Sequence, residues 1–289
     1  MFMRAHHHTH DENHDGQAEA ALAELLDLDA EVLNSYWSDV LSLVERVATP
    51  TSGSRIVDLG AGTGTAAIAL AQRFAGAEVI AVDSSAEMLR RVRAKALALG
   101  LADRIHTVHA DLNSVWPVLD PIDVTWASMS LHHLADPDRV LRDLYAATRP
   151  GGRVAVAEFS EPLRFLPQDL GFGRPGLEQR CLDALTQEHA HSLPELGSDW
   201  SSRLQAAGFT IVGEHTFIIE LNPPHPPSAT RYAEKWLLRL TSGLTHQLAH
   251  DDRETLATLI DSEGAQSLHR RDDLQIRGSR TVTLARRQH

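Results

Sequence analysis

The pattern of hydrophobic positions divides the chain into an N-terminal helical stretch and a longer region where strands and helices alternate. Within residues 18–48, apolar side chains recur every three or four positions, which is helical spacing. After residue 55, short apolar runs alternate with amphipathic helical patterns. The expected strands are 56–60, 78–83, 104–111, 122–130 and 153–160, and the expected helices are 66–74, 86–99 and 137–148. This alternation predicts an α/β fold with a parallel sheet covered by helices on both faces.

The rest of the chain interrupts this rhythm twice. Residues 161–197 and 222–274 are rich in proline or helical patterns, and we expect two insertions there. A strand follows each insertion, at 209–221 and 279–287. We therefore expect one domain, residues 51–289, preceded by a helical cap at 18–50 and a disordered His-rich tail at 1–17.

Composition and charge narrow the class of protein. The 289 residues are 43% hydrophobic and carry a formal net charge of −12, which argues against a nucleic-acid partner. No apolar run reaches the roughly 18 residues of a membrane span, and no secretory signal is visible. The single cysteine, Cys181, cannot form an internal disulfide, so we expect a cytoplasmic protein.

A glycine-rich loop follows the first strand of the alternating region. In the segment Asp58-Leu-Gly60-Ala-Gly62-Thr-Gly64, glycines stand where a buried strand turns into a helix. Glycine permits positive φ and lets a ligand approach the backbone at a helix N-terminus. Taken alone, the loop is equally consistent with a tight strand–helix turn.

Two further acids stand where the next two expected strands end. Asp83 ends the second strand, where a carboxylate can accept ribose hydroxyls, and Asp111 ends the third, where one can accept an adenine amino group. The carboxyl ends of parallel strands meet at one edge of a sheet. One acid there is commonly a turn former, but acids at three successive strand ends, including Asp58, favour a single ligand.

Two cofactors compete for this edge. The spacing Gly62-x-Gly64-x-x-Ala67 satisfies a dinucleotide fingerprint, so NAD is an alternative. However, a carboxylate at Asp58 would repel a pyrophosphate and attract an ammonium, and Asp111 suits a short adenosine ligand. A ligand with a cationic amino-acid end and an adenosine describes S-adenosylmethionine.

The motifs VDLGAGTG, AVDSSAEML, HADL, ASMSLHHLADP and RPGGRVAVAEF resemble those of the class I (Rossmann-like) S-adenosylmethionine-dependent methyltransferases. The resemblance is strongest over residues 55–160. It implies a seven-stranded, mostly parallel sheet whose last strand is antiparallel. It also implies a cofactor site formed by Asp58, Gly60, Ala61, Gly62, Gly64, Asp83, Ser84, Met88, Asp111, Leu112 and Ser128. In that site Asp58 binds the amino-acid end, Asp83 the ribose, and Ser128 lies near the sulfonium.

Methyl transfer needs alignment of the reactants and exclusion of water, with a base only for a protonated nucleophile. His132 and His133 follow the fourth strand and Glu158 ends the fifth, so these are the candidate catalytic residues. Alternatively, the two histidines only support the loop that follows the strand, and Glu158 only caps a turn. Tyr36 and Trp37, in the N-terminal helix, either pack in the core or contact the sulfonium.

We expect the acceptor to be a small molecule, whose identity the sequence leaves open. The sequence also leaves the oligomeric state open, and a homodimer is one option. The two insertions should form a substrate cover, with aromatic and histidine side chains available to line it. These are Phe165, Phe172, His189, His191, Trp200 and Trp236. The histidines of the tail lack the spacing of a structural zinc site, so no metal site is predicted. Incidental binding of Zn²⁺ or Ni²⁺ by this tail is a second option. For the whole protein, the alternative to an enzyme is a non-catalytic protein of the same fold that responds to a cofactor or a metal.

Overall fold

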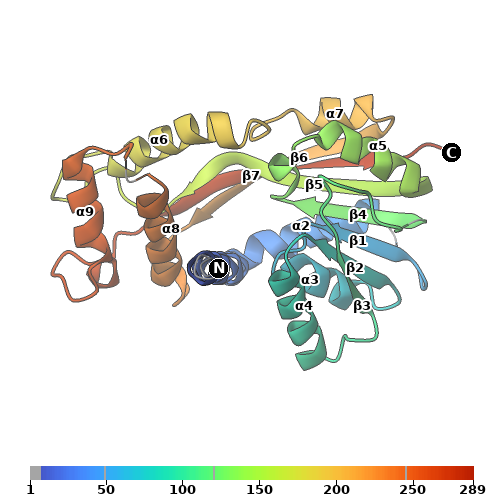
Figure 1. The fold of residues 1–289 in the computed structure, drawn as a ribbon, viewed down its shortest axis with the longest axis horizontal. Helices are drawn as coiled ribbons and strands as arrows, with labels where there is room; N and C mark the ends of the chain where they lie inside the picture. Colours follow the sequence, from blue (N-terminus) through green and yellow to red (C-terminus); the bar gives the residue numbers. More distant parts are fainter. Residues whose placement is uncertain (1–7, 49, 120, 245) are drawn as a thin grey trace, which may run out of the picture.

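The computed structural model describes residues 8–48, 50–119, 121–244 and 246–289. Within this part of the chain, seven strands form one sheet in the order β3-β2-β1-β4-β5-β7-β6 (Figure 1). The strands are β1 (Arg55–Leu59), β2 (Glu78–Asp83), β3 (Ile105–His109), β4 (Ile122–Ser128), β5 (Thr148–Arg164), β6 (Thr210–Leu221) and β7 (Ile276–Arg286). Strands β1 to β5 are parallel, and β7 is antiparallel to both of its neighbours. The predicted seven-stranded, mostly parallel sheet is confirmed.

Helices cover both faces of the sheet. They are α1 (His8–Val32), α2 (Asn34–Val47), α3 (Thr65–Arg73), α4 (Ala86–Ala98), α5 (Pro137–Ala147), α6 (Leu177–Ser192), α7 (Trp200–Ala206), α8 (Ala229–Gly243) and α9 (His250–Ile260), with short 3₁₀ helices η1 (Leu131–His133) and η2 (Leu268–Arg270). Helices α2, α3 and α4 share one hydrophobic core with the sheet, and α5 and α7 share another on the opposite face. The central strands β1 and β4 are buried along most of their length because helices cover both of their sides.

The N-terminal region differs from its prediction in two respects. The expected single helix is two, α1 and α2, which are separated at Leu33. Residues 8–17, expected as part of a disordered tail, form the first turns of α1. His6 and His7 lie outside the described residues, so the metal affinity of the tail stays a prediction.

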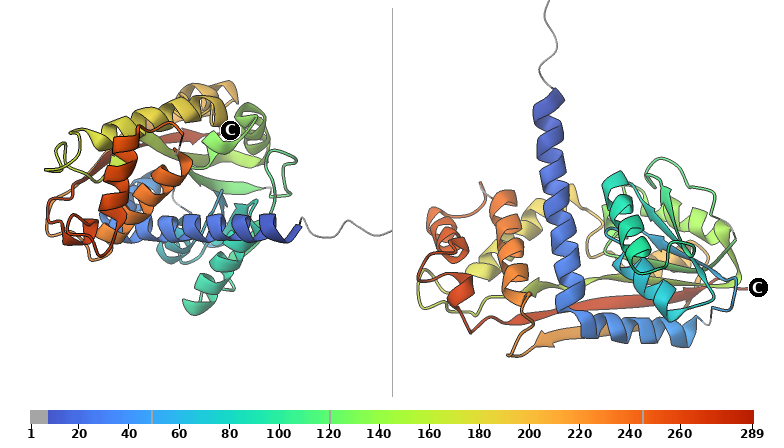
Figure 2. Two further views of the ribbon diagram at one scale, coloured as in Figure 1. Left: turned by 60° about the vertical axis from the view of Figure 1, so that its left-hand side comes forward. Right: turned by 90° about the horizontal axis from the view of Figure 1, so that it is seen from below.

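The two insertions build a second part of the molecule, which we call the lobe. It consists of α6, α8, α9 and η2, packed on the ends of β5 and β7 that extend beyond the parallel strands (Figure 1). Helix α1 runs between α8 and α4 in both views of Figure 2, so it lies between the lobe and the sheet's parallel half. No helix among the described residues is both long enough and apolar enough to cross a membrane.

Candidate functional site

The glycine loop after β1 adopts a backbone that requires glycine. Gly60, Gly62 and Gly64 have φ values of 73°, 51° and 86°, which other residues rarely adopt. A Cβ at Gly60 would stand 2.3 Å from the Cβ of Ser130. The N–H groups of Gly60 and Ala61 both donate to the carbonyl of Val82, at 2.9 and 3.0 Å, which holds the loop over the end of β2.

Asp58 lies beneath this loop as a buried carboxyl group that is incompletely bonded. Its side chain is only 2% exposed, and its Oδ2 has no hydrogen-bond partner. Burial, followed by the negative charge of Asp83, raises the pKa of Asp58 to about 7, against a smaller lowering by the Ala67 N–H. A buried acid that lacks a partner is suited to bind an added cation.

Asp83 closes the other side of the loop. Its carboxylate accepts the N–H of Gly62 and the N–H of Ser85, each at 2.8 Å. Each oxygen keeps a further lone pair for a hydroxyl donor. The structure therefore brings Asp58, Asp83 and the glycine loop together at one sheet edge, as predicted. Next to them, Ser84 follows β2, and the buried Met88 lies in the first turn of α4, where Ser85 caps its N–H at 2.9 Å.

Asp111 is more exposed and bonds within its own turn. Its carboxylate accepts the N–H of Asn113 at 2.9 Å and the hydroxyl of Ser114 at 2.8 Å, and these bonds hold its pKa below the usual value. Leu112, beside it, is buried. Turn formation explains these contacts without a ligand, so the adenine role of Asp111 stays a prediction.

Backbone strain marks the end of β4. Ser128 ends the strand, and Met129 follows with φ at 52°, the only positive φ of a non-glycine residue in the described chain. The Ser130 hydroxyl donates to the carbonyl of Leu59 at 2.8 Å, which fixes this turn against the glycine loop. Such strain is characteristic of functional loops, where surrounding contacts hold it in place.

The candidate catalytic residues meet just beyond that turn. His132 Nδ1 lies 2.7 Å from Glu158 Oε2, and both side chains are buried, at 5% and 7% exposure. The second oxygen of Glu158 has no partner. The ring of His133 lies 4.2 Å from that of His132. Burial is the main cause that lowers the pKa of His133 to about 4, followed by the positive charges of His132 and Arg239, so His133 is neutral at pH 7.

A buried ion pair beside this site has no counterpart in the sequence analysis. Arg280, on β7, pairs with Asp29 of α1, and Asp29 also accepts the hydroxyl of Tyr232 at 2.7 Å. The Arg280 guanidinium lies 4.9 Å from the centre of the Tyr36 ring. Tyr36 itself packs edge-on against Trp37 and Phe217, so its core-packing interpretation fits the structure. The only sequence signal for this ion pair was Arg280 itself, because an arginine on the inward-facing side of a strand needs a buried acidic partner.

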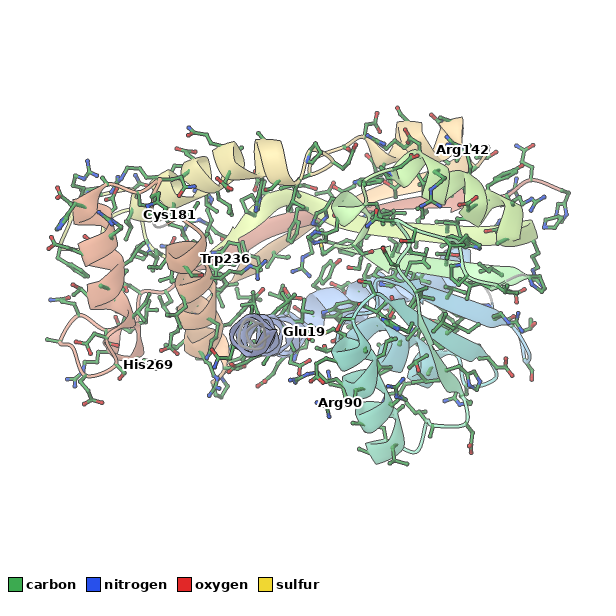
Figure 3. All side chains as sticks on the ribbon, in the orientation of Figure 1. Glu19, Arg90, Arg142, Cys181, Trp236 and His269 are labelled. Atoms are coloured by element: carbon green, nitrogen blue, oxygen red, sulfur yellow. The ribbon has the colours of Figure 1, made fainter. Side chains whose placement is uncertain are left out.

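Helix α1 covers the loop and the start of α4. A Cβ on Gly62 would stand 3.0 Å from Cδ1 of Leu26. Ser85, at the N-terminus of α4, donates to Glu19, which Figure 3 places on the side of α1 that faces α4. Lys95 of α4 pairs with Asp27 at 2.6 Å. Sequence reasoning found the helical cap but not these contacts, because their partners are more than 35 residues apart.

The residues expected to line a substrate cover lie in different parts of the molecule. Trp200 is buried in the core between α7 and the opposite sheet face, so its assignment to the cover is wrong. Phe165 packs against Tyr232 inside the lobe, with ring centres 5.0 Å apart. His189 lies on α6, and burial is the main cause that lowers its pKa. The side chain of His191 lies outside the described residues.

Comparison with known proteins agrees with this geometry. A family model described as a methyltransferase domain matches residues 56–152. The demethylmenaquinone methyltransferase of Clavibacter sepedonicus is 39% identical over 117 residues, 40% of this chain and 46% of that protein. The 27-O-demethylrifamycin SV methyltransferase of Amycolatopsis mediterranei is 32% identical over 161 residues, 51% of this chain and 58% of that protein. The chain thus spans about half the length of the curated relatives it matches.

Solved structures extend the likeness to most of the fold. A putative methyltransferase from Bacillus halodurans superposes with a TM-score of 0.56 at 18% identity, covering 86% of this chain and 99% of that one. The [4+2]-cyclase SpnF superposes with a TM-score of 0.51 at 21% identity, covering 92% and 95%. Since SpnF is a cyclase, the shared architecture does not by itself specify the reaction. Residues 56–152 are thus similar to a methyltransferase domain, and the described chain shares the Rossmann-like fold of these solved structures.

Proposed function

We propose that this protein transfers the methyl group of S-adenosylmethionine to a small-molecule acceptor. The observation that carries the proposal is the buried, unpartnered oxygen of Asp58 beside the glycine loop. A buried carboxylate without a partner is costly, and a bound ammonium removes that cost. The named relatives that act on demethylmenaquinone and demethylrifamycin support a small acceptor.

The residues of the site fit this cofactor. Asp58 would bind its ammonium, the backbone of Gly60 and Gly62 its carboxylate end, and Asp83 its ribose hydroxyls. Ser84, Met88, Asp111 and Leu112 would surround the adenine, with Ser128 near the sulfonium. When bound, the cofactor supplies an activated methyl group, and the protein has to align the acceptor and exclude water. Helix α1, with Leu26 on Gly62, supplies part of that exclusion.

The His132–Glu158 pair supplies a base for an acceptor that arrives protonated. With His132 Nδ1–H donating to Glu158, the Nε2 lone pair is left to accept a proton from an acceptor hydroxyl or amine. Glu158 holds the ring and stabilises the imidazolium that forms. His133, neutral at pH 7, is placed beside the pair and would position the acceptor.

The NAD alternative is not favoured, because an anionic pyrophosphate gains nothing from Asp58. Calorimetric titration separates the two cofactors directly. We expect S-adenosylhomocysteine to bind and NADH not to bind, and Asp83→Ala to weaken S-adenosylhomocysteine at least tenfold through loss of two ribose hydrogen bonds. Tighter binding of NADH would overturn the assignment.

The role of the pair is tested with an acceptor found by screening for S-adenosylhomocysteine release. His132→Gln should lower kcat by roughly 100-fold, the usual scale for general-base removal, with unchanged affinity for S-adenosylhomocysteine. His133→Gln is the matched control and should lower kcat much less. Equal losses in both variants would instead indicate that the two histidines only support the loop.

The buried Cys181 also leads us to propose a cytoplasmic location.

A further inference from the structure

Phe159 is an aromatic residue that stays open to solvent on an inner strand of the sheet. It lies on β5, between β4 and β7, and is 38% exposed. Among the exposed large apolar side chains of the described residues, it is the only aromatic one and the only one on an inner strand. Helices normally cover the apolar side chains of such strands, so an open ring at this position is a candidate contact surface for a ligand.

The register of the sheet places Phe159 on the same face as the proposed cofactor site. Asp58 of β1 pairs with Trp126 of β4. Two residues further along β4, Ser128 pairs with Ala157 of β5. Paired residues point to one face of a sheet, and residues two apart on a strand share that face. Phe159, two residues further along β5, therefore lies on the face of Asp58 and Ser128, just past the end of β4.

The ring of Phe159 also lies beside the candidate base. Its centre is 6.0 Å from the centre of the His132 ring, and the two planes are inclined by 54°. This separation is within the range of a direct aromatic contact. His132 in turn bonds Glu158, the residue before Phe159 on β5, at 2.7 Å. The open ring and the group proposed to take up a proton are therefore neighbours, and a small molecule in contact with one is next to the other.

Arg280 holds Phe159 from the neighbouring strand. The two residues pair across β5 and β7, and the guanidinium carbon lies 5.9 Å from the centre of the Phe159 ring, within cation–π distance. The charge of Arg280 is neutralised by Asp29, whose Oδ2 accepts a hydrogen bond from Nη1 at 3.1 Å. Glu158 is likewise paired with His132. Because both charged groups beside Phe159 already have partners, this surface favours a neutral, apolar part of an acceptor over an ionic one.

We propose that an aromatic ring of the methyl acceptor stacks on Phe159, beside the His132–Glu158 pair and on the sheet face of the proposed cofactor site. Aromatic pairs gain attraction beyond the burial of apolar area, and a saturated ring of the same size does not obtain that gain. The inference rests on the proposed function and narrows its substrate class to acceptors whose methylated atom is close to an aromatic ring. Phe159 is a binding residue and takes no part in moving the methyl group or a proton.

The test uses the full-length protein saturated with S-adenosylhomocysteine. The probes are 1-naphthol and decahydro-1-naphthol, two neutral alcohols with the same carbon skeleton, of which only the first is aromatic. Calorimetric titration measures both affinities. We expect wild type to bind 1-naphthol roughly 2- to 12-fold more tightly, the range of one aromatic pair, and Phe159→Leu to lose that preference. Phe159→Tyr retains a ring and should retain the preference.

Phe172→Leu is the matched control. Phe172 also has an arginine beside it, because the guanidinium carbon of Arg271 lies 5.9 Å from the centre of its ring. The next residue, Gly173, packs closely against Thr255 of α9, so this phenylalanine belongs to the lobe. Its replacement removes an equivalent contact without touching the sheet face of Phe159, and both alcohols should bind as they do to wild type. Affinity for S-adenosylhomocysteine, measured in each variant, is the control for folding.

The outcomes separate this inference from the proposed function. If S-adenosylhomocysteine fails to bind wild type, the proposed function falls and this inference with it. If it binds but wild type binds the two alcohols equally, or binds neither at millimolar concentration, only the aromatic acceptor is excluded. A preference that survives in Phe159→Leu, or that is lost equally in Phe172→Leu, would overturn the role of Phe159.

Discussion

Buried acids occur both beside the glycine loop and in the lobe, and their surroundings differ. In the lobe, Asp252 is held by Arg174 at 2.8 Å and by Arg180 at 2.7 Å, and Glu178 accepts two backbone N–H groups at 2.8 and 3.0 Å. Beside the loop, Asp58 keeps one oxygen without any partner. The lobe acids have their partners within the folded chain, whereas the free oxygen of Asp58 is the one that we propose binds the cofactor's ammonium.

The pKa values of these acids agree with this difference in part, but they do not by themselves distinguish Asp58 from the acids of the lobe. The two arginines lower the pKa of Asp252, whereas burial raises that of Asp58 to about 7. Burial also raises the pKa of Glu178 to about 7, although both of its oxygens are bonded. A raised pKa alone therefore does not mark a binding site, and the unpartnered oxygen is the distinguishing feature.

The largest effect is expected from Asp58→Asn on cofactor affinity. The amide cannot form a charge-assisted bond with an ammonium, a bond of roughly 1.5–3 kcal/mol, so affinity for S-adenosylhomocysteine should fall by about 10- to 100-fold. Calorimetric titration at pH 7.5 measures the change. Unchanged affinity would mean that Asp58 is a structural acid like those of the lobe.

The complementary change is Asp252→Asn, which should act on stability alone. It leaves two arginines without their shared acid. Because Arg174 and Arg180 are 51% and 32% exposed, the loss should be nearer 2 kcal/mol than the 3–5 kcal/mol of a fully buried pair. Denaturant unfolding at pH 7 measures it, with affinity for S-adenosylhomocysteine as the control. The lowered pKa of Asp252 means that its contribution is lost as pH falls, so wild type and variant should converge in acid.

The sequence predicted the parallel half of the sheet better than the lobe for a physical reason. Strand β2 was predicted at its observed bounds, because short apolar runs that end in an acid or glycine are local signals. Asp58 and Asp83 follow from the same rule, since parallel strand ends share an edge. By contrast, Asp29 and Arg280 are 251 residues apart, and no local pattern connects them.

Two errors have similar causes. The break between α1 and α2 at Leu33 is hidden because buried apolar residues continue through it with helical spacing. Trp200 was assigned to the substrate cover because an apolar pattern identifies a buried helix face but not the sheet face that it meets.

A smaller effect with the opposite sign is expected from Asp58→Asn on stability without cofactor. The pKa of this carboxyl rises from an ordinary 3.8 in the unfolded chain to about 7 in the folded protein, so ionisation costs the folded state up to roughly 4 kcal/mol above pH 7. A buried amide with its own unmet hydrogen bonds returns about 1–3 kcal/mol of that cost. We therefore expect the variant to gain about 1 kcal/mol at pH 8, measured as a Tm increase of roughly 2–4 °C.

The gain should disappear on acidification, because the folded carboxyl is already neutral below pH 7 and the unfolded carboxyl also takes up its proton as the pH falls toward 3.8. Near pH 4 the Tm values of the two proteins should agree or favour wild type. A gain that stays constant from pH 4 to pH 8 would contradict a titrating Asp58. Saturating S-adenosylhomocysteine should also reverse the order at pH 8, because only wild type gains the ammonium contact.

The smallest effect is expected where α1 meets the parallel half of the sheet. Lys95 and Asp27 lie 2.6 Å apart but are 36% and 39% exposed, whereas Arg280 and Asp29 are 3% and 15% exposed. Exposed pairs contribute about 0–1 kcal/mol and are screened by salt, so Lys95→Met should change stability by less than about 0.5 kcal/mol. Amide hydrogen exchange should nevertheless rise in α1 more than in α8, because the variant loses a contact between α1 and α4. The buried pair between Asp29 and Arg280 still holds the C-terminal end of α1 against β7. An equal rise of hydrogen exchange in α1 and α8 would mean that α1 and the lobe open as one unit. That result would contradict the expectation that the exposed contact of α1 with α4 is weaker than its buried contact with β7.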